Sequence, residues 1–489
     1  MRTLGDLQFD NTYARLPATF YQHVEPTPIP DPYLVAFNPD AARLIDLDPA
    51  EANKPGFVEY FSGNKLLPGS EPIAMKYAGH QFGSWVPQLG DGRAILLGEV
   101  KNSAGERWDF HLKGSGKTMF SRFGDGRAVL RSSIREYLAC EALHALGIPT
   151  TRALCIVGTD LEVYRESVEP GAVIVRMAPS HVRFGSFEVF AHRGQTESVK
   201  TLADYVIDQH YPELLDADDR YASFLREVVA RTARLMAKWQ AVGFAHGVMN
   251  TDNMSILGLT LDYGPYGFLE DFDPGFICNH SDETGRYAFD QQPRIGYWNL
   301  AALATSLLSL MSADEARAAL NTYADAFNQH MHELMTAKLG LTMREEGDQL
   351  PWTSLLDVLA ESRVDYTIFF RKLGTFATSP GASNQTVRNV FADPTAFDRW
   401  ASRYAERLRS ENSLDAQRKS RMDQVNPKYI LRNYLAQIAI ERAQHQKDFS
   451  EVDRLRGVLR LPFDEQPETE HYAETAPEWG RHLQVSCSS

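Results

Sequence analysis

The chain has 489 residues, of which 43% are hydrophobic and 23% charged, enough for a large two-lobed domain with a buried core. Its formal net charge of −14 argues against general binding to nucleic acid or anionic membranes. No apolar run reaches the length of about 18 residues that a membrane-spanning helix needs. The N-terminus resembles neither a signal nor a transit peptide. We therefore expect a monomer in the bacterial cytoplasm.

The first part of the chain is predicted to be rich in strands and to contain one helix. Residues 1–70 are rich in Pro and aromatic residues, and we expect them to pack on the core rather than fold alone. An apolar stripe predicts a helix over about 128–146, ended by Gly147 and Pro149. The second of two predicted hairpins is expected to turn at 169–171. The paired strands of these hairpins are 93–100 with 107–113 and 161–166 with 173–177.

The second part of the chain is predicted to be almost entirely helical. Helices are expected over about 221–241, 298–310, 314–339 and 427–444. A strand-rich part followed by a helical part predicts an α+β fold of two lobes with a cleft between them. The expected units are an N-terminal extension, a strand-containing N-lobe, a helical C-lobe and a helical C-terminal extension, over residues 1–70, 71–185, 186–400 and 401–489.

The pattern most informative about function is His246-Gly-Val-Met-Asn-Thr-Asp-Asn253, followed nine residues later by Asp262-Tyr-Gly264. The spacing is that of the catalytic loop and metal-binding turn of protein kinases, H-R-D-x-x-x-x-N and D-F-G. Asn253 and Asp262 supply the hard oxygen ligands that Mg²⁺ prefers when it is shared with phosphates. A turn is the simpler alternative, because Asn, Asp and Gly are common turn residues. The intervening residues 254–261 are predicted to form an apolar hairpin.

The catalytic carboxylate of kinases is missing from this pattern. Val248 occupies its position, and a valine can neither accept a proton nor orient a hydroxyl. Asp252 is the nearest carboxylate able to replace it, although it could equally be a helix-cap or turn residue. General-base help is worth about 10²–10⁴ in rate, so its loss would slow turnover while sparing nucleotide binding. The chain therefore keeps the residues expected to bind metal and nucleotide but lacks the kinase base, so we expect it to catalyse a different reaction.

A lysine and a glutamate upstream complete the kinase-like order. Lys113 ends a predicted strand on its polar face, and Glu136 lies 23 residues later in the predicted helix. In kinases a strand Lys holds the nucleotide phosphates and is fixed by a helix Glu. Taken singly, each residue would be an ordinary surface charge. Their order relative to Asn253 and Asp262 favours the functional interpretation.

Glycines and arginines suited to phosphate binding flank these residues. The segments 88–93 and 123–127 each contain Gly-Asp-Gly-Arg, which permits close backbone approach to phosphates but is also common in turns. Arg176 alternates with an apolar strand face and points away from it, whereas Arg183 lies in a predicted loop. Arginine suits bidentate phosphate contacts. Exposed salt bridges are an equally good account of these two residues.

These stretches closely resemble the selenoprotein O family of kinase-like proteins, also described as bacterial protein adenylyltransferases or nucleotidyltransferases. The resemblance covers essentially the whole chain, with no departure at the functional positions. The matching stretches are Phe9-Asp-Asn-Thr-Tyr-Ala-Arg-Leu-Pro17, Gln88-Leu-Gly-Asp-Gly-Arg93, Leu112-Lys-Gly114, Phe123-Gly-Asp-Gly-Arg-Ala128, Arg131-Ser-Ser-Ile-Arg-Glu-Tyr137, His246–Asn253 and Leu261-Asp-Tyr-Gly264.

The resemblance implies a protein-kinase-like fold and the transfer of AMP from ATP to Ser, Thr or Tyr hydroxyls of proteins. UTP is a second candidate donor. ATP would lie reversed relative to kinases, so that its α-phosphate faces the incoming hydroxyl. Mg²⁺ or Mn²⁺ would be bound by Asn253 and Asp262, and Asp252 would be the base.

The resemblance also assigns the nucleotide-binding residues. Lys113, paired with Glu136, would hold the phosphates, and Arg176 and Arg183 would take the γ-phosphate. Asp262 would bind the nucleotide as well as the metal ion. The remaining residues expected to line the nucleotide pocket are Gly90, Gly92, Arg93, Asp125 and Gly126.

The four cysteines have no C-x-x-C or zinc-type spacing. Cys140 and Cys155 lie in apolar segments and are expected to be buried. Cys487 is three residues from the end of the sequence and is expected to be exposed. The resemblance implies redox regulation through a disulfide between Cys487 and Cys278. Two unrelated free thiols are the alternative.

Two other functions compete with nucleotidyl transfer. One is a phosphotransferase acting on protein or on a small molecule, and Val248 argues against it. The other is a catalytically inactive pseudokinase scaffold that binds nucleotide. The joint retention of Lys113, Glu136, Asn253 and Asp262 argues against that scaffold, since a scaffold does not need both metal ligands.

Overall fold

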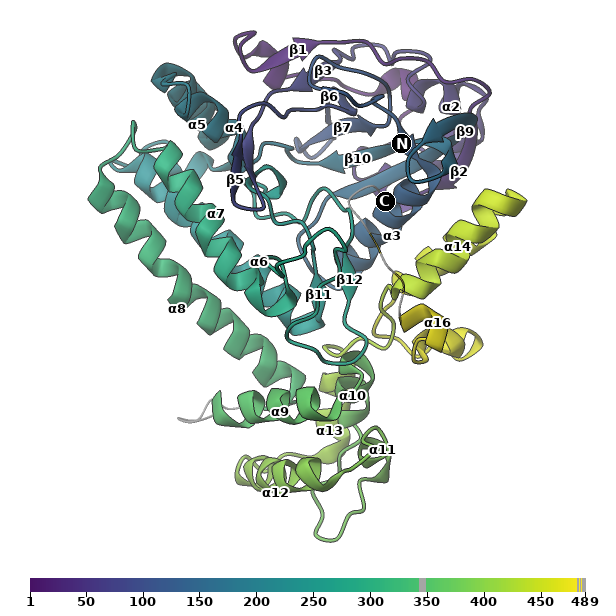
Figure 1. Ribbon diagram of the computed structural model, residues 1–489, viewed down its shortest axis with the longest axis vertical. Helices are drawn as coiled ribbons and strands as arrows, with labels where there is room; N and C mark the ends of the chain where they lie inside the picture. Colours follow the sequence, from purple (N-terminus) through teal and green to yellow (C-terminus); the bar gives the residue numbers. More distant parts are fainter. Residues whose placement is uncertain (343–348, 482, 484, 486–489) are drawn as a thin grey trace.

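The computed structural model describes residues 1–342, 349–481, 483 and 485. It has the expected α+β, kinase-like architecture of two lobes, with an antiparallel sheet at one end and helices at the other (Figure 1). The sheet runs in the order β1-β3-β6-β7-β10-β9-β2, and β8 pairs with β10. Its strands are β1 (Tyr21–His23), β2 (Tyr33–Phe37), β3 (Ile73–Met75), β6 (Ala94–Lys101), β7 (Arg107–Lys113), β8 (Ala128–Val129), β9 (Arg152–Tyr164) and β10 (Val168–Ala178).

The first predicted hairpin is confirmed as β6 and β7, but the predicted turn of the second hairpin is wrong. Val168 pairs with Tyr164, so the chain turns at 165–167, and residues 169–171 lie inside β10. Pro170 has no N–H to donate to a ladder, and proline is tolerated in strands mainly at edges and bulges. The register shifts between Pro170 and Ala172, which accommodates the proline within the strand.

The first 70 residues pack on the sheet as expected and also extend it. They supply β1 and β2, together with the short helices α1 (Pro39–Arg43) and α2 (Gly56–Phe61). Phe57 and Phe61 are fully buried in an apolar cluster that includes Phe110 and Val175 of the sheet. Burying one such phenylalanine contributes about 1.5–3 kcal/mol. This cluster covers one face of the central strands and leaves their other face, with Lys113 and Arg176, to the helical part.

The helix predicted over 128–146 is α3 (Leu130–Ala145), and the one predicted over 221–241 is α6 (Arg220–Val242). Gly243 ends α6 in a left-handed conformation with φ of 73°, which glycine adopts without a steric penalty. The other helices of this lobe are α4 (Phe184–Ala191), α5 (Thr196–His210), α7 (Gln292–Ser306) and α8 (Ala313–Lys338). Two short hairpin-like pairs lie between the lobes: β4 (Gly79–Gln81) with β5 (Ser84–Val86), and β11 (Phe244–Ala245) with β12 (Gly267–Phe268).

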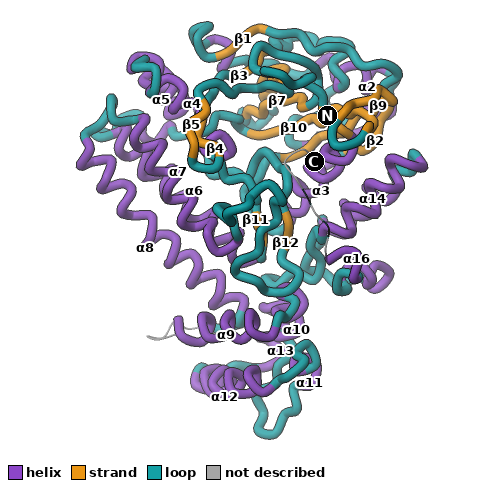
Figure 2. The backbone as a smooth tube through the Cα atoms, viewed as in Figure 1, coloured by secondary structure: helices purple, strands orange, loops and turns teal. Residues whose placement is uncertain are grey.

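The C-terminal helices divide between two places (Figure 2). The helices between residues 349 and 423 form the end of the molecule farthest from the sheet, whereas α14 and α15 return to pack against α3. The helix predicted from residue 427 begins only at Asn433, because the N–H groups of Lys428 and Tyr429 bond instead to the Pro462 carbonyl. These helices are α9 (Gln349–Ser362), α10 (Tyr366–Leu373), α11 (Gln385–Arg388), α12 (Thr395–Ser410), α13 (Asp415–Asp423), α14 (Asn433–Gln446), α15 (Ser450–Leu459) and α16 (Glu478–Arg481).

Two of the unit boundaries expected from the sequence fall inside helices. The one between residues 185 and 186 lies in α4, and the one between 400 and 401 lies in α12. Both α4 and α12 continue unbroken across these positions. Within the described ranges, no helix is both long and apolar enough to cross a membrane.

Candidate active site

A cavity of about 560 Å³ lies where the sheet meets the loops of the helical part. Most of the predicted site residues line it, whereas Glu136 and Arg183 lie behind it and contact residues that do. The predicted residues on its wall are Gly90, Gly92, Arg93, Lys113, Asp125, Gly126, Arg176, Asp252, Asn253 and Asp262. The fold therefore brings residues from both halves of the sequence to one cavity.

Lys113 and Glu136 form an ion pair at the inner wall. Alternation along β7 places Lys113 on the face opposite Leu112, and α3 carries Glu136 to the same point. Lys113 Nζ lies 2.5 Å from Glu136 Oε2, and both side chains are buried. Burial lowers the pKa of Lys113, while the Glu136 carboxylate opposes that shift. The pair fixes the ammonium group at the cavity wall.

Asp262 lies between two buried guanidinium groups. Arg176 bonds to its Oδ1 and Arg183 to its Oδ2. Burial alone would raise the pKa of Asp262, but Arg183 and Arg176, helped by Lys113, hold that pKa well below its usual range. Asp262 has a φ of 58°, in the left-handed region that Asp tolerates better than most residues. In this state the metal-ligand candidate and the two phosphate-binding candidates pair with one another.

Arg176 is held in place by groups that were not among the predicted site residues. Arg176 Nη2 lies 2.6 Å from His111 Nδ1, and His111 Nε2 lies 3.1 Å from Asp91 Oδ2. Burial lowers the pKa of His111, so the neutral ring accepts from Arg176 and donates to Asp91. His111 is two residues from Lys113 on the same strand face, which is the signal that would have identified it.

The kinase-like loop folds back on itself beside the cavity. His246 Nε2 lies 2.9 Å from the Leu261 carbonyl, and this contact joins the loop to the turn that carries Asp262. Asn253 donates its Nδ2 hydrogen to the Val248 carbonyl at 2.9 Å, which leaves Oδ1 as the ligand atom of its side chain. Val248 also lines the cavity, but its side chain is apolar and offers no group that could accept a proton.

Asp252 is a buried carboxylate with spare hydrogen-bonding capacity. Its Oδ2 accepts from Gln81 Nε2 at 3.2 Å, and no described residue bonds to its Oδ1. Burial raises the pKa of Asp252 to about 7, although Arg183 and Gln81 act in the opposite direction. Gln81 belongs to β4, and the sequence analysis did not identify it.

The hairpin expected over residues 254–261 does not form. Ser255 instead bridges Arg183, and Thr260 bridges Thr150, so each end of this segment pairs with a different part of the chain. The hairpin is absent because the buried backbone groups of this segment bond to the N-lobe rather than to each other. The segment therefore ties the loop of Asp252 to the stretch that carries Arg183.

Close packing accounts for the glycines at the mouth of the cavity. A Cβ on Gly90 would lie 2.5 Å from the Phe120 ring, and one on Gly126 would lie 2.2 Å from the backbone of Gly116. Both residues have positive φ, of 105° and 74°. Only glycine lets these loops approach so closely. At the same edge Arg93 is exposed, while Asp125 is paired with Arg165 at 2.8 Å.

Asn253 and Asp262 suit a hard divalent cation. Both present oxygen atoms to the same cavity, and the amide nitrogen of Asn253 is already engaged. Mg²⁺ binds such oxygens together with phosphate and water. Because both oxygens of Asp262 are held by guanidinium groups, metal–nucleotide binding would require an exchange in which phosphate takes the arginines and the ion takes the carboxylate.

The predicted burial of Cys140 and Cys155 is confirmed. Cys278 is also buried, with its Sγ 3.5 Å from the Ala245 carbonyl and close beside Gly247 of the kinase-like loop. Val485 bridges Asn279, so the chain two residues before Cys487 runs beside the residue that follows Cys278. Cys487 itself lies outside the described residues.

Known proteins resemble this chain along its whole length. The sequence model of a family described as "Protein adenylyltransferase SelO" matches residues 3–460. A relative described as "Protein nucleotidyltransferase YdiU" from Myxococcus xanthus is 63% identical over 489 residues, covering 100% of both chains. Relatives of the same description from Thiobacillus denitrificans and Pseudomonas fluorescens are 59% and 54% identical, again over 100% of each chain. The chain therefore belongs to the SelO family and is a protein nucleotidyltransferase.

Proposed function

We propose that this enzyme transfers AMP from ATP to Ser, Thr or Tyr hydroxyls of proteins, with ATP reversed relative to kinases. The observation that carries the proposal is the position of Asp252. It is a buried carboxylate with an unbonded oxygen, and it faces the same cavity as the paired Arg176 and Asp262. Val248, which replaces the kinase base, leaves Asp252 as the nearest carboxylate in the loop.

The charge balance of the inner wall supports the binding of a polyphosphate there. Three cations, Lys113, Arg176 and Arg183, contact only two carboxylates, Glu136 and Asp262. A buried excess of positive charge is costly unless an anion compensates it. The γ-phosphate of a reversed ATP would supply that anion, since guanidinium groups bind phosphate bidentately. The α-phosphate would then lie toward the open side of the cavity.

In the reaction that follows, the Asp252 carboxylate accepts the proton of the substrate hydroxyl. The hydroxyl oxygen bonds to the α-phosphorus, and the bond from that phosphorus to the bridging oxygen breaks, releasing pyrophosphate. Lys113, Arg176 and Arg183 stabilise the negative charge on the leaving group. A Mg²⁺ or Mn²⁺ ion held by Asn253 and Asp262 would add to this stabilisation. Arg183 also donates to the Asp252 carbonyl at 2.8 Å, which links the phosphate-binding group to the base.

Labelled ATP tests the proposal directly. The enzyme is incubated with Mg²⁺, an acceptor protein and ATP labelled at either the α or the γ position. We expect label on protein only from the α position, together with release of pyrophosphate. Transfer from the γ position alone would establish a phosphotransferase, and no transfer alongside measurable ATP binding would establish a scaffold. Repeating the assay with UTP labelled at its α position ranks the two nucleotide donors.

We also propose that a disulfide between Cys278 and Cys487 regulates this activity. Support comes from the bridge between Asn279 and Val485, which brings the tail alongside Cys278, and from the contact of Cys278 with Gly247 in the loop of the base. Activity is compared in oxidised and reduced protein, with Cys487→Ala as the control. Equal activity in both redox states would remove this switch.

A further inference from the structure

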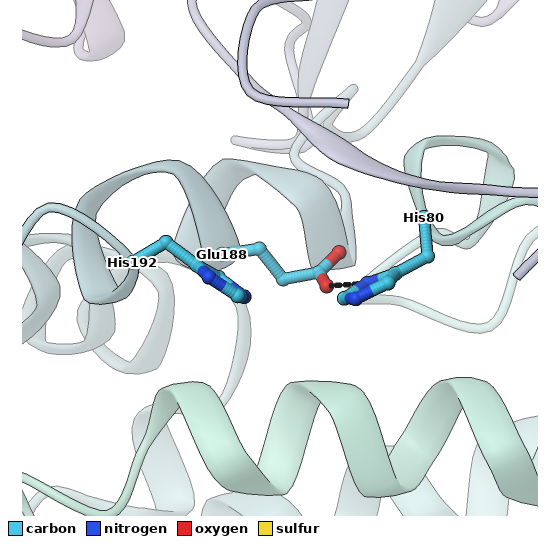
Figure 3. A group of neighbouring side chains, drawn as sticks. All are labelled: His80, Glu188 and His192. Carbon is cyan, nitrogen blue, oxygen red and sulfur yellow. Dashed lines mark hydrogen bonds and ion pairs between the residues drawn. The ribbon is translucent and has the colours of Figure 1, made fainter. Parts of the chain in front are cut away.

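Two histidines and a glutamate converge outside the cavity, between the β4–β5 hairpin and helix α4 (Figure 3). His80 comes from β4, Glu188 from α4, and His192 is the residue that caps the C-terminus of α4. One potential ligand atom from each residue lies within 4.8 Å of the others. Figure 3 shows the Glu188 carboxylate between the two imidazole rings. None of the three belongs to the wall of the proposed active site.

Only one of the two oxygens of the Glu188 carboxylate has a hydrogen-bonding partner among the described residues. Its Oε1 lies 2.6 Å from His80 Nδ1, but no described residue bonds to its buried Oε2. The side chain of Glu188 has 0% exposure, so water does not compensate the unpaired oxygen at the surface. A buried carboxylate oxygen without a partner is expensive, and buried charges are normally paired or bound to metal. This oxygen is an independent sign that the cluster can bind a cation.

Helix spacing and ring packing hold the two histidines beside the carboxylate. Glu188 and His192 are four residues apart, so they project from the same side of α4. The His192 ring stacks on Trp85 with ring centroids 3.7 Å apart, and the His80 ring contacts Trp298 edge-on at 5.2 Å. Such packing restricts the ring orientations. His192 is exposed, which gives an ion a path from solvent and an open coordination position.

We propose that His80, Glu188 and His192 form a second metal site, of the kind that binds Zn²⁺ or a similar divalent transition ion. Two imidazoles and one carboxylate are a common ligand set for Zn²⁺, completed by water, whereas Mg²⁺ prefers oxygen ligands alone. The ion takes the place of the hydrogen between His80 Nδ1 and Glu188 Oε1, and His192, with a ligand atom within 4.8 Å of theirs, completes the site. It is chemically distinct from the Asn253–Asp262 pair in the cavity.

An ion at this position would tie the hairpin to the catalytic loop. The N–H of His80 donates to Thr251 Oγ1 at 2.7 Å, and the neighbouring Gln81 bonds to Asp252. On the other side, the Gly185 carbonyl at the start of α4 accepts from the Ala78 N–H at 3.1 Å. The site therefore joins the two elements that hold Gln81 and Arg183 in position. We assign it a positioning role rather than a role in the transfer step.

Zinc titration of the full chain tests the proposal. Metal-free protein in excess Mg²⁺ is titrated with Zn²⁺ by calorimetry, and Co²⁺ is added in parallel to record its visible absorption. We expect one tightly bound Zn²⁺ per chain and a Co²⁺ spectrum typical of nitrogen and oxygen ligands. His192→Ala changes an exposed side chain and should weaken Zn²⁺ binding by at least about tenfold, since even second-shell changes cost 10–100-fold. Glu188→Gln is the second ligand variant.

Two control variants distinguish this site from Zn²⁺ binding elsewhere in the chain. His445→Ala removes an exposed histidine on α14 and should bind Zn²⁺ as the wild type does. Asp262→Asn alters the cavity and should also retain Zn²⁺ binding. If wild type binds no Zn²⁺, or if His192→Ala binds it equally well, the proposal is wrong. Loss of Zn²⁺ binding in Asp262→Asn but not in His192→Ala would place the ion in the cavity instead and would likewise overturn it.

Discussion

Two buried ion clusters in this protein have opposite charge balances. At the inner wall of the cavity, Lys113, Arg176 and Arg183 outnumber their carboxylate partners. In the C-terminal part, the buried Arg432 pairs with two carboxylates, those of Glu270 and Asp365, the latter at 2.9 Å. The first cluster borders an open cavity. The second joins the start of α14 to the start of α10 and faces protein.

The pKa shifts of the carboxylates reveal the same difference. In the Arg432 cluster burial outweighs the attraction of Arg432, so the pKa values of Glu270 and Asp365 are both raised. In the cavity the cations outweigh burial, so the pKa of Asp262 is strongly lowered. The Arg432 cluster has excess carboxylates and faces protein, which indicates a structural role, whereas excess cations beside a cavity suit an anionic ligand. This distinction predicts different consequences for similar substitutions.

The largest expected effect is on catalysis by Asp252. Asp252→Asn keeps the size and the Gln81 contact but cannot accept a proton. We expect nucleotidyl transfer to fall by about 10²–10⁴, the usual contribution of a general base. ATP affinity, measured by calorimetry, should stay within a few fold because the cations proposed to bind phosphate are untouched. If ATP binding disappears from a folded variant, Asp252 is a binding residue and not the base.

The Arg432 cluster is expected to affect stability and not the reaction. Arg432→Met leaves the buried Asp365 and the partly buried Glu270 without their bonded cation, which costs about 3–5 kcal/mol in the free energy of unfolding. Urea denaturation measures this loss. The matched control is Arg226→Met, which breaks an exposed pair with Asp219 and should cost no more than about 1 kcal/mol. A change in the ATP affinity of folded Arg432→Met protein would show that the two clusters are coupled.

Replacing an arginine of the cavity by methionine is expected to affect ATP affinity more than stability. In Arg176→Met, Asp262 is still paired with Arg183, so the protein should lose less stability than Arg432→Met does. Removing a charged hydrogen-bond donor from the phosphate site costs about 1.5–3 kcal/mol, or roughly 10–150-fold in ATP affinity. Calorimetry with ATP and urea denaturation of the same sample compare the two effects. A stability loss equal to that of Arg432→Met with unchanged ATP affinity would contradict the proposed role of this arginine.

Most residues of the cavity wall could be predicted from the sequence, because strand alternation and motif spacing are local patterns. Strand alternation placed Lys113 and Arg176 on the correct face, and the spacing within 246–262 brought Asn253 and Asp262 to one place. Gln81 contacts Asp252 across 171 positions of sequence, and no local pattern marks that contact. Strand alternation places His111 on the face of Lys113, but its partner Arg176 is 65 positions away and cannot be identified from that alternation. Pro170 was misread as a turn because a register shift, which depends on the neighbouring strand, lets it stay in β10.

The smallest expected effect is a pH-dependent change in stability at Asp252. Its pKa is raised to about 7 in the folded protein, above the ordinary value, so between about pH 4 and pH 7 the folded state holds a proton that the unfolded chain releases. The stabilisation from this group is therefore present at low pH and is lost as the pH rises through 7. Asparagine cannot ionise and avoids that loss.

Asp252→Asn should therefore gain stability over the wild type as the pH is raised from 5.5 to 8, by about 2 kcal/mol for a shift of this size. Urea denaturation at the two pH values measures the gain. Transfer by the wild type should move in the opposite direction, rising to a plateau above about pH 7, because only the ionised carboxylate accepts a proton. A flat stability difference between the variants would mean that the carboxylate is ionised throughout.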